Sequence, residues 1–131
     1  MHIFLSSMNL TEYLQSIVEK IPGIESIAVT DREGVEVFST AGVSEETQVI
    51  SVIFALTHEQ VQKLEEFGET DYLYTEHQDG HSTLQLNAYP LHILINAKAV
   101  PRNVLVDAGL QCRSTLEPVR KLVLAANARM N

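Results

Sequence analysis

Residues 44–67, SEETQVISVIFALTHEQVQKLEEF, decide the architecture of this chain. Between Val49 and Leu56 only one residue is polar, so a strand over 49–53 is one interpretation. Three features favour a single long helix instead. The segment is long, it contains no Gly or Pro, and it opens with Glu45–Glu46, where a helix N-terminus favours negative charge. We therefore predict one helix over 44–67.

The apolar surface of this predicted helix is unusually wide. At 100° per residue its apolar side chains cover roughly 200° of arc, whereas a helix packed on one sheet buries an arc nearer ~100°. The stripe formed by Val49, Val52 and Leu56 has no obvious partner in the same chain. Leaving it in water would forgo about 5 kcal/mol and create an adhesive patch. Either a second molecule covers it as a dimer interface, or another element of this chain does.

Before this segment, the sequence predicts a helix and a β-hairpin. Apolar residues recur at helical spacing from Leu10 to Ile21, and Pro22–Gly23 ends the helix. Residues 24–31 then alternate in polarity, and 35–38 do so after a turn that contains Asp and Gly. Two alternating runs joined by such a turn predict a hairpin.

After the segment, the sequence predicts three strands and a last helix. A strand over 71–77 places Tyr72 and Tyr74 on one face and Leu73 on the other, and both tyrosines are of a residue type enriched at interfaces. If it is an edge strand, it can extend the sheet into a neighbouring molecule. An Asp-Gly turn at 79–80 leads to a strand at 84–88, and Pro90 separates that strand from the next one at 91–97. The helix from residue 101 should kink at Pro118.

The order α-β-β-α-β-β-β-α predicts an α/β (α+β) fold, with a five-stranded, mostly antiparallel sheet and helices on both faces. No repeat or linker interrupts residues 1–131, so we expect one domain, with the first eight residues flexible. The start of the chain has no secretory leader pattern, and no stretch approaches the ~18 apolar residues of a membrane helix. We expect a cytosolic protein.

Charge and chemistry-bearing residues point away from several functions. Nine basic and seventeen acidic residues give a net charge of −8, which disfavours nucleic acid and anionic membrane surfaces as direct partners. The only cysteine, Cys112, falls on the apolar stripe of the last helix, so we expect a core residue and not a nucleophile. His77 and His81 flank a turn, and His58 and His92 lie on polar faces; all four are expected at the surface. We therefore predict no catalytic residue, no metal site and no cofactor.

Ile21–Glu25 and Ile27–Val35 look like the first hairpin of the roadblock/LC7 family. Within that family, the chain resembles the MAP-kinase scaffold members of the Ragulator complex. The likeness runs from about Leu10 to Leu124, and its further motifs are Phe54–Thr57, Gln60, Lys63–Leu64, Pro90–Leu91 and Leu116–Pro118.

This resemblance implies a non-catalytic adaptor that forms an obligate heterodimer with a second roadblock protein. It implies that the central helix and the next strand make the dimer contact, which in this sequence means Val49, Val52, Leu56, Tyr72, Leu73 and Tyr74. It also implies other Ragulator subunits, MAP-kinase pathway kinases and Rag GTPases as partners, and a role in TOR signalling. The expected location is the cytosolic face of late endosomes and lysosomes, reached through another subunit's lipid anchor.

Two other functions remain open at this stage. The first is direct regulation of small GTPases by a roadblock dimer, although nothing in the sequence selects an arginine finger among Arg32, Arg102, Arg113, Arg120 and Arg129. The second is a ligand-holding sensory domain of the PAS or profilin-like shape, which the scarcity of inward polar residues on the strands disfavours.

Overall fold

The computed structural model describes residues 7–40 and 72–130. The predicted helix over 44–67, and with it Val49, Val52 and Leu56, lies outside the described residues. The same holds for His58 and for residues 1–6.

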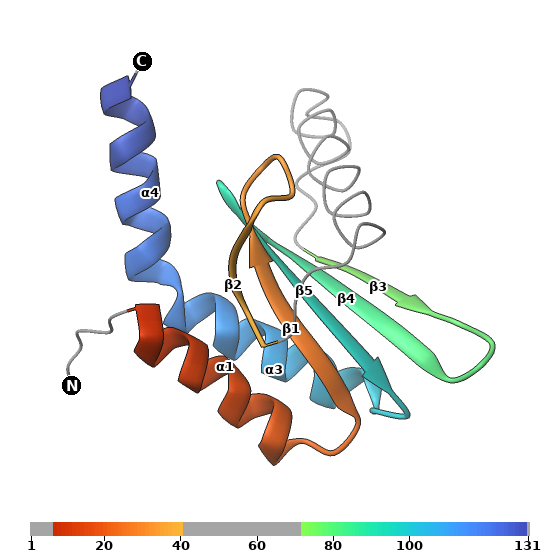
Figure 1. The fold of residues 1–131 in the computed structure, drawn as a ribbon. Coiled ribbons are helices and arrows are strands. Elements are labelled where there is room, and N and C mark those ends of the chain that lie inside the picture. Colours follow the sequence, from red (N-terminus) through yellow and green to blue (C-terminus); the bar gives the residue numbers. More distant parts are fainter. Residues whose placement is uncertain (1–6, 41–71, 131) are drawn as a thin grey trace, which may run out of the picture.

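Five strands form one antiparallel sheet, as we predicted, and their order across the sheet is β2-β1-β5-β4-β3 (Figure 1). β1 and β2 form the first hairpin. β4 and β5, which follow one another later in the chain, form another. β2 and β3 are the two edges of the sheet among the described strands. The bounds are β1 Ile24–Thr30, β2 Glu36–Ser39, β3 Tyr72–Glu76, β4 His81–Ala88 and β5 Leu91–Lys98.

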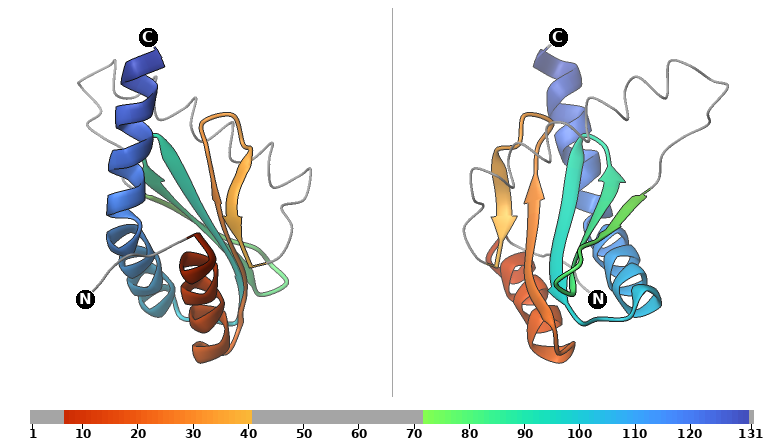
Figure 2. Two further views of the ribbon diagram at one scale, coloured as in Figure 1. Left: turned by 60° about the vertical axis from the view of Figure 1, so that its left-hand side comes forward. Right: turned by 90° about the vertical axis from the view of Figure 1, so that its right-hand side faces the viewer.

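Two helices cover one face of this sheet. α1 (Ser7–Lys20) packs on β1 and β2, and α3 (Arg102–Thr115) packs on β4 and β5 (Figure 2). Their buried side chains share a single core with the inward-facing residues of the strands. The strand register aligns these residues in rows such as Ile27–Ile95–Leu84 and Val29–Ile93–Leu86, which is why alternation in the sequence predicted the sheet.

The turns follow the local chemistry that predicted them. Asp31 Oδ1 accepts hydrogen bonds from the backbone N–H groups of Glu33 (2.8 Å) and Val35 (3.0 Å), which closes the first hairpin. Gly34 and Gly80 take positive φ angles of 83° and 92° in their turns. A cis peptide bond joins Tyr89 to Pro90 between β4 and β5.

One detail of the last helix differs from the prediction. The last helical stretch is broken at Leu116 into α3 and α4 (Glu117–Met130), where we expected one helix with a kink. Pro118 stands in the first turn of α4, a position that does not require its missing N–H group.

The prediction that His92 lies at the surface was wrong. Its side chain is only 3% exposed, and its Nε2 atom lies 3.1 Å from Oε1 of Gln85 on the neighbouring strand. A polar side chain can be buried when a partner forms a hydrogen bond with it. Alternation along β5 shows which face of the sheet His92 is on, but it does not show whether that face is exposed to solvent.

Candidate interaction surface on the edge strand

β3 has one strand neighbour among the described residues. It pairs with β4 along its whole length, from Tyr72 opposite Leu86 to Glu76 opposite Ser82. In the sheet of described strands, its other side therefore carries backbone N–H and C=O groups without a ladder partner. Such an edge is a template for pairing with another chain.

The two faces of β3 differ in chemistry. Tyr72 and Tyr74 lie opposite the core residues Leu86 and Leu84, and both rings are partly buried against that core. Leu73 points to the other face and is 45% exposed. Thr75 and Glu76 are also exposed. The strand thus combines partly buried aromatic rings with an accessible aliphatic side chain.

The first turn of α3 contacts the face of β3 that carries the two tyrosines. The guanidinium of Arg102 lies over the ring of Tyr74 at 5.3 Å from its centre, in a cation–π contact. The Tyr74 hydroxyl donates to Glu76 Oε1 at 3.1 Å. Between Tyr72 and the α3 residues Val106 and Asp107 lies an open pocket of about 480 Å³. A rigid aromatic rim beside a shallow pocket is typical of a protein-binding surface.

The structure brings together three of the six residues predicted for the dimer contact. Tyr72, Leu73 and Tyr74 are consecutive on the edge strand. Val49, Val52 and Leu56 fall outside the described residues, so their part in the contact stays a prediction. The sequence did not predict the contact of Arg102 with the Tyr74 ring, because a contact between β3 and α3 joins residues far apart in the chain.

The candidate reactive groups lie elsewhere. Cys112 is fully buried in the core, and burial raises the pKa of its thiol to about 12, which suits a packing residue and not a nucleophile. His81 Nδ1 lies 2.9 Å from Asp79 Oδ2, and its Nε2 lies 3.5 Å from Glu25. The backbone N–H of His81 also donates to Asp79 and lowers the pKa of that carboxyl. Within residues 7–40 and 72–130, no group of three His, Cys, Asp or Glu side chains could hold a metal ion.

The fold recurs in known structures. A roadblock/LC7 domain from Streptomyces avermitilis superposes with a TM-score of 0.67 at 12% identity, over 83% of this chain and 95% of that one. The gliding protein MglB of Thermus thermophilus gives 0.69 at 10% identity, over 91% and 94%. MglB of Myxococcus xanthus gives 0.70 at 10% identity, over 92% and 94%. The fold is that of the roadblock/LC7 domains. A comparison with curated protein sequences finds no match.

The family follows from the sequence itself. The family model described as "Mitogen-activated protein kinase kinase 1 interacting" matches residues 8–106, which include nearly all of α1, the five described strands and the start of α3. The chain belongs to the mitogen-activated protein kinase kinase 1 interacting family. The family supports a scaffold or adaptor role. None of the helices in the described part of the chain is long and apolar enough to cross a membrane.

Proposed function

We propose that this protein is a non-catalytic adaptor subunit that pairs with a second roadblock protein through β3 and the segment before it. The observation that carries the proposal is the β3 edge, which presents an exposed Leu73 on one face and the partly buried rings of Tyr72 and Tyr74 on the other. Strand addition at this edge would continue the sheet into the partner, with main-chain hydrogen bonds for affinity and side chains for specificity.

The role of such a subunit is to hold other proteins together. Tethering raises their effective concentration without any chemical step in the adaptor. The matched family supports a MAP-kinase pathway kinase as one partner. The resemblance of the sequence to Ragulator scaffold members extends the proposal to other Ragulator subunits, Rag GTPases and TOR signalling. On that basis the complex works at the cytosolic face of late endosomes and lysosomes, where another subunit supplies the lipid anchor.

A matched pair of variants tests the pairing surface. Leu73→Glu introduces a charge on β3, and Val37→Glu introduces the same charge at a similarly exposed position (40%) on β2, the opposite edge strand. Native mass spectrometry of each variant, co-expressed with the candidate roadblock partner, measures the heterodimer. We expect Leu73→Glu to weaken pairing about 30-fold or more, the effect of losing a central contact, and Val37→Glu to pair normally. If the two variants form the heterodimer equally well, the assignment of the pairing surface to β3 is refuted.

The central segment can be tested in the same assay. We expect Leu56→Glu or Val52→Glu to abolish the heterodimer, because both lie on the apolar stripe that the sequence leaves without a partner. The pathway kinases should keep their intrinsic activity in the presence of these variants. A variant that still co-purifies with its roadblock partner counts against the proposal.

Direct regulation of a small GTPase is the alternative function. A finger arginine must reach into a partner's active site, but four arginines of the described residues already have contacts within the chain. Arg32 and Arg102 lie over tyrosine rings, and Arg113 and Arg120 donate to backbone carbonyls. These contacts favour structural roles. Stimulation of GTP hydrolysis by the purified chain would support the alternative over the adaptor.

A further inference from the structure

α3 packs directly on the strand next to the edge of the sheet. A Cβ atom at Gly109 would lie 2.7 Å from Cδ2 of Leu84 and 2.8 Å from Cδ1 of Leu86, so the absence of a side chain allows this close approach to β4. β3 is the next strand, and its Tyr72 lies opposite Leu86. Tyr72 therefore points to the face of the sheet that carries α3.

The open pocket of about 480 Å³ beside Tyr72 lies between this strand and α3. We call it the edge pocket; α3 contributes Arg102, Asn103, Val106 and Asp107 to its lining. Tyr72 and Val106 are partly buried against the core and supply apolar surface. Arg102 and Asp107 carry opposite charges, so the lining has no net charge. A neutral cavity with an aromatic ring and an aliphatic side chain favours an uncharged, apolar occupant.

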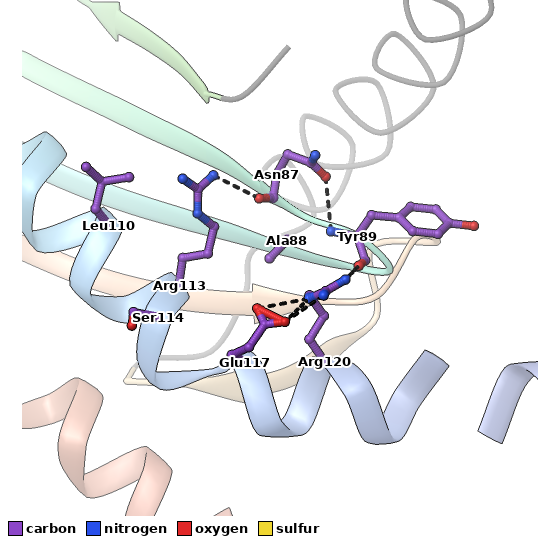
Figure 3. Close-up of a pocket in the computed structure, with 8 residues that line it drawn as sticks. All are labelled: Asn87, Ala88, Tyr89, Leu110, Arg113, Ser114, Glu117 and Arg120. Atoms are coloured by element: carbon purple, nitrogen blue, oxygen red, sulfur yellow. Dashed lines mark hydrogen bonds and ion pairs between the residues drawn. The ribbon is translucent and has the colours of Figure 1, made fainter. Parts of the chain in front are cut away.

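A second pocket, at the junction of α3 and α4, has a different character (Figure 3). Arg113 donates to the carbonyl oxygen of Asn87 at 3.2 Å. Arg120 donates to the carbonyl oxygen of Tyr89 at 3.0 Å and also bonds to Glu117 through Nε at 2.8 Å. The charged groups of this pocket thus have partners within the chain, and none of its residues belongs to β3. Of the two pockets, the edge pocket is the one that adjoins the proposed pairing strand.

A strand added to β3 would place a side chain at the edge pocket. Opposite residues of neighbouring antiparallel strands point to the same face, with Cβ atoms about 5 Å apart. The residue of an added strand that stands opposite Tyr72 therefore points to the α3 face, beside the Tyr72 ring. Because the edge pocket is the open space on that face next to Tyr72, this side chain is the one that can enter it.

We propose that the edge pocket receives a large apolar side chain of the roadblock partner, from the residue that stands opposite Tyr72 when the partner's strand pairs with β3. This inference rests on the proposed function, because it requires strand addition at β3. The Tyr72 ring and Val106 contact the entering side chain, and removal of this apolar surface from water adds to the affinity. The pocket thereby selects partners with a large apolar residue at that position over partners with a small or charged one.

Filling the pocket tests the proposal. Asn103 is an exposed residue of the lining, so Asn103→Trp places a bulky side chain in the pocket from a position outside the core. Gln111→Trp introduces the same side chain at an exposed position of α3 that does not line the pocket. Native mass spectrometry over a dilution series gives the dissociation constant of each complex with the candidate roadblock partner. We expect Asn103→Trp to weaken the complex about tenfold or more and Gln111→Trp to change it less than twofold.

Leu73→Glu in the same series separates this proposal from the proposed function. Leu73 lies on the other face of β3 and does not line the pocket, so its effect reports on strand pairing. If Leu73→Glu weakens the complex and Asn103→Trp does not, the role of the pocket is overturned and pairing at β3 stands. If neither variant weakens the complex, both proposals fail.

A double-mutant cycle identifies the occupant. Each residue of the partner's pairing strand is replaced by Ala and measured against the native chain and against Asn103→Trp. We expect one large apolar residue whose replacement weakens the complex about tenfold with the native chain and less than twofold with Asn103→Trp, because the Trp side chain already excludes it from the pocket. If no partner residue depends on position 103 in this way, or if the dependent residue is small or charged, the proposal is overturned.

Discussion

Replacement of Gly23 by Ala tests how α1 is joined to the sheet. Gly23 has a φ angle of 103°, and a Cβ atom there would lie 2.5 Å from the carbonyl oxygen of Lys98 and 2.6 Å from Cγ2 of Val100. The N–H of Lys98 also donates to the carbonyl oxygen of Gly23 at 2.7 Å, so the two backbones cannot separate without losing a hydrogen bond. We expect Gly23→Ala to be strongly destabilising.

Gly80 supplies the matched control. Its φ angle of 92° is similar, but a Cβ atom there would meet nothing within 4 Å. Gly80→Ala therefore carries only the conformational cost of a left-handed alanine, about 1–2 kcal/mol. Gly23→Ala adds the steric cost of overpacking, about 1–3 kcal/mol, for a total of about 2–5 kcal/mol.

Urea unfolding followed by circular dichroism measures both variants. Linear extrapolation gives each free energy of unfolding, and the difference between the variants isolates the steric contribution from the conformational one. We expect Gly23→Ala to lose at least about 1 kcal/mol more than Gly80→Ala. Equal losses would show that β5 does not approach Gly23 closely, and the reasoning from the backbone contact would fail.

Three further predictions concern buried and charged side chains. Cys112 should resist thiol reagents at pH 8 and react only as the chain unfolds, because burial raises the pKa of its thiol to about 12; rapid labelling of the native chain would contradict this. Hydrogen bonds lower the pKa values of the Asp79 and Glu117 carboxyls, so the stability they add is present above pH ~4 and is lost as the pH falls below that value. Thermal unfolding is measured between neutral and acidic pH. The double variant Asp79→Asn, Glu117→Gln should lose less stability on acidification than the native chain. His92→Leu should cost about 1–3 kcal/mol by leaving the buried Gln85 amide without this partner, and adding Gln85→Leu should recover part of that loss in urea unfolding; a further loss would argue against the pair.

Local signals predicted most of the described fold. The hairpin around Asp31 and the turn at Gly80 depend on neighbouring residues, so their chemistry is visible in the sequence. Alternation assigned Tyr72 and Leu73 to opposite faces of β3, and the register confirms this. The sequence left the edge position of β3 conditional; among the described strands it follows from the strand order.

The features that were missed depend on contacts between distant segments. The burial of His92 depends on Gln85 of the neighbouring strand, and the position of Arg102 over Tyr74 depends on how α3 crosses the sheet. Periodicity alone also could not separate a kink at Pro118 from the break at Leu116, because the apolar stripe continues across both. The helix over 44–67 and its apolar stripe remain predictions of the sequence.

Hydrogen exchange with mass spectrometry tests the pairing of β3 most directly. The full chain is compared alone and in complex with the candidate roadblock partner. We predict that exchange at residues 72–76 slows in the complex, because the unpaired side of the strand gains main-chain hydrogen bonds, while exchange at residues 36–39 on β2 is unchanged. If exchange slows at β2 and is unchanged at β3, the assignment of the interface to β3 is contradicted.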